Sequence, residues 1–208
     1  MVARSLLPAL AALSTLAGCA ANLPPRVAID APDWRAVATS NDRERLRGWR
    51  DAWNAALAQA NSAEDLNRIQ AEGALLRPDA ALGNAALPPG VYRCRVIKLG
   101  SQGALRRSYT AYPAFDCRVD DEGQVDGFHK VSGSQRPQGL VFPDSATRQV
   151  FLGTLMLGDE TRAVEYGADR DRDMAGVIER VGPRKWRLVL PYPRFESLID
   201  VIELVPAA

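Results

Sequence analysis

The chain has 208 residues, 47% of them hydrophobic and 25% charged, which is ordinary for a single soluble globular domain and excludes disordered and collagen-like chains. Only one apolar stretch approaches membrane length, which argues against a polytopic membrane protein. The formal net charge of +1 gives no electrostatic reason to expect a nucleic-acid partner. One histidine and three cysteines leave little material for metal or nucleophile chemistry.

Residues 1–18 have the pattern of a lipoprotein signal peptide. Arg4 precedes a run rich in Ala and Leu, and the sequence LAGC at residues 16–19 matches the bacterial lipobox, in which the cysteine thiol accepts the lipid. Ala20 is not the aspartate that retains lipoproteins in the inner membrane of enteric bacteria. We therefore expect a periplasmic protein that is lipid-anchored through Cys19, with delivery to the outer membrane favoured. The alternative is an ordinary secretory signal with a chance cysteine.

The cysteine count then predicts one disulfide. Because the lipid takes Cys19, an even pair, Cys94 and Cys117, is left in an oxidising compartment. Each lies in a strand-like context with its side chain on the aromatic-bearing face. A bond between them would close a loop of about two dozen residues and contribute roughly 3 kcal/mol in the chain-entropy model. Two buried thiols or a reactive thiol are the alternatives.

Residues 19–33 contain Pro24-Pro25 and predict an extended tether, after which residues 34–208 are expected to form a single domain. Residues 34–77 have a helical pattern, with Ser40 or Asn41 as the first N-cap and Ser62 as the second. A stripe at spacings of three and four residues predicts a core-facing side made of Leu46, Trp49, Trp53, Ala56, Leu57 and Ala60. We expect a helical hairpin that turns at Asn61-Ser62.

Beyond the loop at residues 78–90 the hydrophobic period changes to two, which indicates strands over residues 91–206. The candidate strands are 91–99, 109–119, 124–132, 138–142, 149–157, 161–166, 174–181, 185–190 and 198–205. Many short strands at close spacing favour an antiparallel barrel or sandwich over a parallel sheet. The fold class expected is therefore α+β: an N-terminal helical hairpin followed by an antiparallel β-barrel-like or sandwich sheet with one disulfide.

No catalytic residue is assigned. Any Ser-His-Asp arrangement would have to use His129, the single histidine of the chain. Of the serines considered with it, Ser132, Ser134 and Ser145, none lies in a Gly-x-Ser-x-Gly elbow. The plain interpretation is a strand histidine that is hydrogen-bonded to a neighbour. Among 25 acidic residues nothing singles out the pair of carboxylates that glycoside chemistry needs.

No metal site or cofactor is predicted either. Asp169, Asp171 and Asp173 alternate as in a calcium-binding loop, but the glycine and glutamate that such a loop needs further on are missing. The arginines between these aspartates favour a salt-bridged turn on the surface.

A candidate ligand-binding segment lies between two predicted strands. Ser134, Gln135 and Arg136 gather a hydroxyl, an amide and a guanidinium that suit a carboxylate or a phosphate. The alternative is a turn whose arginine pairs with a nearby acid. Cations on the predicted strands would line an anion pocket if several of them pointed into a barrel, although such residues more often cover an outer face. The cations considered are Arg93, Arg95, Lys98, Arg118, Arg180, Arg184, Lys185 and Arg187.

Four segments resemble a known family. YRCRVIKLG, GSQRP, VFLGTLMLGDE and RKWRLVLPYPRFESLIDVIELVP, together with the start DWRAVAT, are similar to the family called domain of unknown function 4893. That family comprises small secreted or lipid-anchored proteins of Alphaproteobacteria, notably sphingomonads. The resemblance covers essentially the whole mature chain. It implies no catalytic or binding residue, because the family has no established activity to carry over.

The sequence favours a non-enzymatic periplasmic lipoprotein. It would hold an apolar or anionic small ligand or act as an envelope interaction module, and the scarcity of catalytic side chains supports this expectation. The expected partners are the membrane, through the N-terminal lipid, and a small ligand or an envelope protein, with no nucleic acid. The alternative is a hydrolase of envelope polymers or esters that uses carboxylates or His129.

Overall fold

The computed structural model describes residues 32–103 and 108–207. Cys19, the signal peptide and most of the tether lie outside these ranges, so their predictions are not addressed by the structure. None of the helices in the described part of the chain has the length and apolar character needed to span a bilayer.

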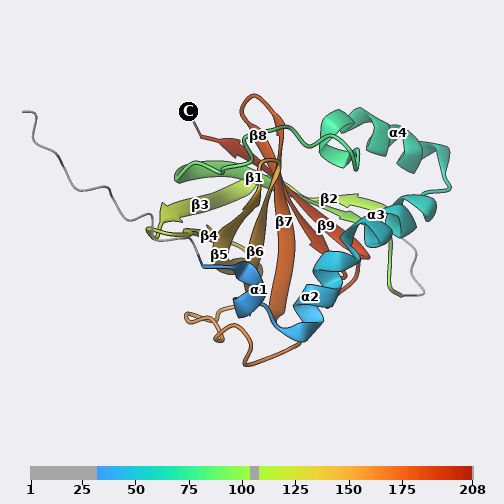
Figure 1. The fold of residues 1–208 in the computed structure, drawn as a ribbon. Helices are drawn as coiled ribbons and strands as arrows, with labels where there is room; N and C mark the ends of the chain where they lie inside the picture. Colours follow the sequence, from blue (N-terminus) through green and yellow to red (C-terminus); the bar gives the residue numbers. More distant parts are fainter. Residues whose placement is uncertain (1–31, 104–107, 208) are drawn as a thin grey trace, which may run out of the picture.

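The helical part is built of five short segments. Their bounds are α1 (Trp34–Val37), α2 (Ser40–Arg47), α3 (Trp49–Ala58), α4 (Ala63–Ala71) and the 3-10 turn η1 (Gly73–Leu76). The predicted cap at Ser62 is confirmed, since its side chain accepts a hydrogen bond from the Asp65 N–H. The first cap is wrong by one position: Thr39 caps α2 by accepting from the Asp42 N–H. Gly48 separates α2 from α3, and α4 runs back from the far end of α3 (Figure 1).

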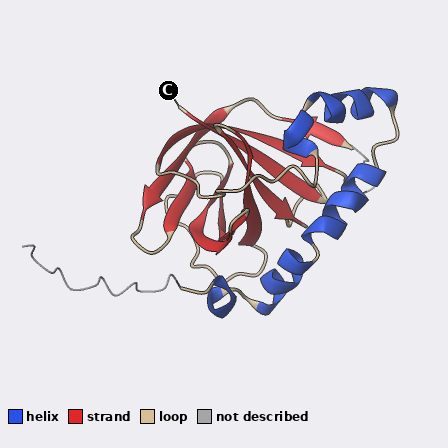
Figure 2. Ribbon diagram, turned by 45° about the horizontal axis from the view of Figure 1, so that its top comes forward, coloured by secondary structure: helices blue, strands red, loops and turns tan. Residues whose placement is uncertain are grey.

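The predicted apolar stripe is confirmed as core. Trp53 and Ala56 are fully buried, and Leu46, Trp49 and Ala60 are buried as well. Trp49 and Trp53 meet edge to face with ring centroids 6.0 Å apart. Figure 2 shows these helices lying along one side of the sheet. They therefore cover an outer face of the β part and do not enter it.

The strand pattern is largely as predicted, with two corrections. The predicted strand 109–119 is interrupted at residues 112–114 and becomes two strands, while residues 161–166 lie in a loop where no strand is formed. The strand bounds are β1 (Gly90–Leu99), β2 (Tyr109–Ala111), β3 (Phe115–Asp121), β4 (Asp126–Lys130), β5 (Gln135–Ser145), β6 (Arg148–Leu157), β7 (Asp173–Gly182), β8 (Lys185–Pro191) and β9 (Ile199–Pro206).

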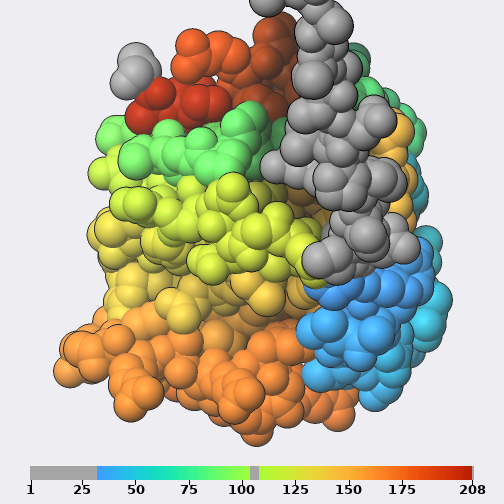
Figure 3. Space-filling model, turned by 60° about the vertical axis from the view of Figure 1, so that its left-hand side comes forward, coloured from blue at the N-terminus to red at the C-terminus, as the bar shows by residue number. Residues whose placement is uncertain are grey.

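These strands form an antiparallel barrel of eight strands with one extra strand. The order is β2-β1-β3-β4-β5-β6-β7-β8-β9, and pairing of β1 with β9 closes the barrel. β2 is the extra strand and pairs only with the C-terminal end of β1. Figure 3 shows the outer wall, in which green β1 is followed by β3, β4 and β5 toward yellow, with the orange loop at 158–172 beside them. The fold is thus α+β with an antiparallel barrel, as the sequence indicated.

Alternation along the strands produces two separate cores. One lies inside the barrel, and its largest members are Tyr92, Phe128, Phe151 and Trp186. The other lies between the helices and the outer face of the barrel, where Trp53, Leu75, Ile97, Phe142 and Val201 pack together. Because one side chain in two points to each core, strands β6 to β9 are buried on both faces.

The barrel interior is tightly filled. Gly139 and Gly153 are cross-strand partners, and a Cβ at Gly139 would come within 2.2 Å of the Leu152 carbonyl oxygen. Phe128 and Phe151 meet edge to face with centroids 5.6 Å apart, and Tyr92 and Trp186 do so at 6.4 Å. The barrel is therefore packed by side chains, as small barrels commonly are.

The predicted disulfide is confirmed. Cys94 and Cys117 are bonded, with 5.9 Å between their Cα atoms, and both side chains are buried inside the barrel. Tyr92 pairs with Cys117 and Cys94 pairs with Phe115, so the bond joins β1 to β3 at the end of their short ladder.

Candidate functional site

The barrel wall has an opening where β1 changes partner. β1 pairs with β3 only over Gly90–Cys94, and from Ile97 onward its neighbour on that side is β2. β4 ends at Lys130 and its register with β5 stops at the pair His129–Gln138, so residues 135–137 of β5 have no β4 partner on that side. The resulting pocket has a volume of about 460 Å³. We call it the wall opening; its lining is Val96, Lys98, Tyr112, Pro113, Phe115, Lys130, Ser132, Gly133, Ser134, Gln135 and Glu196.

Lys98 lies at the inner side of the wall opening and is paired. Its Nζ donates to Asp200 Oδ2 at 2.9 Å and lies 3.4 Å from Glu196 Oε2. Both Lys98 and Asp200 are buried, and the Ser197 hydroxyl donates to the second Asp200 oxygen. Burial opposes the charge on Lys98, but the carboxylates of Asp200 and Glu196 outweigh it and raise its pKa. Lys98 is thus a charged but compensated wall residue.

Lys130 differs from Lys98 because no carboxylate among the described residues forms an ion pair with it. Its Nζ lies 4.1 Å from the centroid of the Phe115 ring, and a Cβ at Gly133 would come within 3.3 Å of it. Burial, together with the nearby cations Lys98 and Arg136, lowers the pKa of Lys130, and the smaller opposing effect of the Asp200 carboxylate does not cancel this. An anion bound beside such a half-buried ammonium group would stabilise its charged form.

A smaller pocket continues from the wall opening into the end of the barrel. It shares Val96, Lys98, Lys130 and Gln135 with the opening and has a volume of about 50 Å³. We call it the inner crevice. Besides the shared residues, its lining has the apolar side chains of Pro137, Leu155, Met174, Leu190, Pro193, Phe195 and Ile202 and the charged side chains of Arg45, Asp171, Arg172, Asp173, Arg194 and Asp200. The packed barrel core ends it, so the crevice has room for only a few water-sized groups.

The structure separates the three predicted ligand-binding residues. Ser134 and Gln135 line the wall opening, whereas Arg136 is not among its lining residues. Instead, the Arg136 guanidinium donates to the carbonyl oxygens of Gly133, Gly158 and Glu160 at 2.6 to 2.7 Å. Arg136 therefore holds the adjoining loops together, and both of its terminal nitrogens are already engaged.

Of the strand cations that the sequence singled out, Lys98 alone lines the wall opening. Arg95 lies outside the barrel, between Glu72 and Glu203. Arg187 is fully buried under the helices, where it pairs with Glu179 at 2.6 Å and donates to the Arg77 carbonyl. Arg95 and Arg187 thus follow the alternative that the sequence favoured, in which strand cations cover the outer face of the sheet.

Sequence reasoning missed Lys130 and Asp200. A signal was present for Lys130: it follows Phe128 by two positions, which puts it on the same face as that apolar residue. The composition held another signal, since Lys98, Lys130 and Lys185 are the only three lysines of the chain. Two of the three line the wall opening.

His129 lies on the face of β4 opposite to Phe128. Its side chain is 38% exposed, and Nδ1 lies 3.6 Å from Asp120 Oδ2. Within residues 32–103 and 108–207 no hydrogen bond connects it to a serine. This geometry does not assemble a nucleophile and base around His129.

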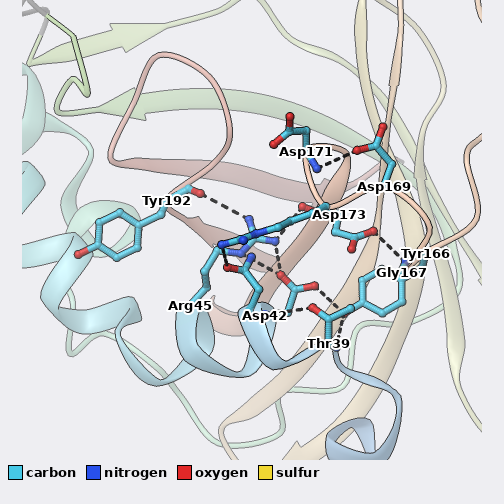
Figure 4. A network of polar contacts seen from close by, with 11 residues as sticks. Thr39, Asp42, Arg45, Tyr166, Gly167, Asp169, Asp171, Asp173 and Tyr192 are labelled. Carbon is cyan, nitrogen blue, oxygen red and sulfur yellow. Dashed lines mark hydrogen bonds and ion pairs between the residues drawn. The ribbon is translucent and has the colours of Figure 1, made fainter.

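The aspartate-rich loop is held by protein groups. Arg172 pairs with Glu160, and Arg194 with Asp171. Figure 4 shows Arg45 of α2 donating to Asp42 and to the carbonyl oxygens of Asp173 and Tyr192. The described residues contain no group of three or more His, Cys, Asp or Glu side chains placed to hold a metal ion.

The comparisons with known proteins place the chain without naming an activity. A family model described as a domain of unknown function (DUF4893) matches residues 34–204, which includes both the helices and the barrel. A search of curated proteins found no match.

Proposed function

We propose that this chain, which belongs to the DUF4893 family, is a non-enzymatic periplasmic lipoprotein that binds a small anionic molecule in the wall opening. The anchor and the compartment rest on the lipobox that ends at Cys19 and on the paired cysteines. The binding role rests on the geometry of the barrel wall.

The observation that carries the proposal is that Lys130 has no ion pair among the described residues. The other cations that line the wall opening and the inner crevice each have a carboxylate partner: Lys98 with Asp200, Arg45 with Asp42, Arg172 with Glu160 and Arg194 with Asp171. A bound anion would supply the missing partner and restore the charged form that burial disfavours. Apolar walls beside a few polar groups are typical of small-molecule sites.

Binding is better supported than hydrolysis. The two ionisable groups at the back of the opening, Lys98 and Asp200, are paired with each other. His129 lies on the face of β4 opposite to the face that carries Phe128 and Lys130. It is not among the residues that line the wall opening. A nucleophile with an oriented base is the arrangement that acyl-transfer chemistry requires, and the opening does not present it.

Native mass spectrometry of the mature protein, isolated from its own envelope in mild detergent, tests the proposal. We expect the polypeptide mass from Cys19 onward, the mass of acyl groups, and a further small anionic adduct. The adduct should be absent from a Lys130→Met variant and present in the matched variant Lys185→Met, whose lysine pairs with Glu203 on the outer face. A non-acylated chain would overturn the anchor, and a protein without adduct that binds no added anion would overturn the binding role.

A further inference from the structure

We infer that the wall opening selects a short monocarboxylate, whose carboxylate pairs with Lys130 and whose apolar end enters the inner crevice. This inference rests on the proposed binding role and names the ligand class. Four features carry it: the missing ion pair of Lys130, the choice of lysine, the free polar side chains, and the shape of the cavity.

The pairing of the charges favours a single negative charge. Lys98 takes both nearby carboxylates, Asp200 at 2.9 Å and Glu196 at 3.4 Å, and both terminal nitrogens of Arg136 donate to carbonyl oxygens. Lys130 is left without an ion pair of its own among the described residues. A monoanion would match it, whereas a phosphate dianion would bring a second charge into a half-buried place without a partner.

The use of lysine supports a carboxylate over a phosphate. The chain uses arginine at most of its basic positions, yet both cations that line the wall opening are lysines. Arginine offers the planar fork that binds phosphate by two parallel hydrogen bonds, while lysine is a compact point charge. Arg136, the nearest guanidinium in sequence, faces carbonyl oxygens outside the lining.

Two neutral polar side chains are available for a carboxylate. Ser134 and Gln135 line the opening, and neither side chain has a hydrogen-bond partner among the described residues. A hydroxyl and an amide N–H beside an ammonium group are donors that a carboxylate accepts from. Gln135 also lines the inner crevice, so it marks the boundary between the two pockets.

The shape of the cavity limits the length of the apolar part. Val96 and Phe115 form apolar walls near Lys130, and Leu155 and Ile202 line the crevice behind them. The crevice measures about 50 Å³ and stops at the packed interior of the barrel. A chain of a few carbons fits this space, whereas a long acyl chain would have to displace buried aromatic rings.

Isothermal titration calorimetry of the mature lipoprotein in detergent micelles tests the inference with four probes. These are hexanoate, dodecanoate, inorganic phosphate and hexylamine, each corrected for its heat with protein-free micelles. We expect hexanoate to bind at least about tenfold more tightly than the other three. Lys130→Met should weaken hexanoate binding about tenfold or more, and Lys185→Met should leave it unchanged.

Three results would overturn the inference. They are tighter binding of phosphate than of hexanoate, equal or tighter binding of dodecanoate, and unchanged hexanoate binding in folded Lys130→Met. If Lys130→Met is poorly folded by thermal unfolding, Lys130→Gln replaces it in the same comparison. A different result would overturn the proposed function: none of the three anions binds, and the native protein carries no adduct. If an anion of another class binds through Lys130, only the assignment of the ligand as a carboxylate is overturned.

Discussion

Glu72 shows how a single carboxylate fastens the helical part to the barrel. It follows α4 and accepts hydrogen bonds from both Arg95 terminal nitrogens, at 2.9 and 2.6 Å, and from the Tyr109 hydroxyl at 2.7 Å. Arg95 in turn pairs with Glu203 of β9. Burial works against the charge on Glu72, but the hydrogen bonds from Arg95 and Tyr109 outweigh it and hold its pKa below 4.5. The ionised form therefore stabilises the fold.

This lowered pKa predicts a stability that depends on pH. A carboxyl whose pKa is depressed by folding contributes fully above its unfolded pKa near 4.5, and the contribution is lost as the pH falls through the lowered folded value. Glu72→Gln should reduce the free energy of unfolding by about 2 kcal/mol at pH 7. The difference in the free energy of unfolding between the wild type and this variant should become smaller below about pH 4.5.

Urea unfolding at pH 7, 5, 4 and 3 measures this gap. Glu64→Gln is the matched control, because Glu64 pairs with Arg68 on the exposed face of α4. It should change the free energy of unfolding by less than about 0.5 kcal/mol at each pH. A gap for Glu72→Gln that stays constant from pH 7 to pH 3 would contradict the assigned role of the charge.

At the scale of elements, α2 holds the loop that closes one end of the barrel. The Tyr166 hydroxyl donates to Asp42 Oδ2 at 2.6 Å and accepts from the Thr39 N–H at 3.1 Å. Asp42 is fully buried, and Arg45 reaches from the same helix to the carbonyl oxygen of Asp173 at the start of β7. Burial and the contact with Asp42 raise the pKa of Tyr166, so its hydroxyl keeps its proton. The loop at 158–172 is thus tied to a helix more than a hundred residues away.

Tyr166→Phe should loosen this loop. Loss of the hydroxyl leaves the buried Asp42 with fewer donors and should cost about 1–2 kcal/mol of stability. Limited proteolysis should cut within residues 158–172 faster than in the wild type, because local opening becomes easier. Tyr112→Phe is the control, since that tyrosine is 41% exposed. Equal cleavage rates in the two variants would show that the loop does not depend on Tyr166.

For the molecule as a whole, the disulfide secures the place where the barrel closes. β1 and β3 share only a short ladder, from Gly90 to Cys94 on the β1 side, and the Cys94–Cys117 bond lies at its end beside the wall opening. The ladders between β5 and β6 and between β1 and β9 are longer. The disulfide therefore adds a covalent link at the β1–β3 seam, where the barrel wall has only a short ladder of backbone pairs.

Replacing both cysteines, Cys94→Ala with Cys117→Ala, should lower the free energy of unfolding by about 3 kcal/mol. Hydrogen exchange should accelerate more at the β1–β3 seam than along β6 and β7, because few backbone bonds hold the seam. Reduction of the wild type should reproduce the loss, and reductant should not affect the double variant. Unchanged unfolding of the double variant would contradict a structural role for the bond.

The amino-acid sequence by itself determined the features that arise within a few residues of one another. The stripe with Trp49 and Trp53 specified a buried helix face, the cap at Ser62 began α4, and alternation marked most of the strands. The even pair Cys94 and Cys117 predicted the disulfide. The interruption at residues 112–114 and the loop at 161–166 were missed, because alternation alone does not show whether a segment has a neighbouring strand to pair with.

Only the tertiary structure decided which side chains meet. Lys98 and Asp200 are 102 positions apart and become partners because β1 pairs with β9 when the barrel closes. Lys130 lines the wall opening because β4 ends at this residue and because the pairing of β3 with β1 stops at the pair Cys94–Phe115. Arg136, by contrast, turns to carbonyl oxygens of the adjoining loops. Strand order and register fix such contacts, and these depend on pairing across the whole chain, which local patterns of hydrophobicity and charge do not encode.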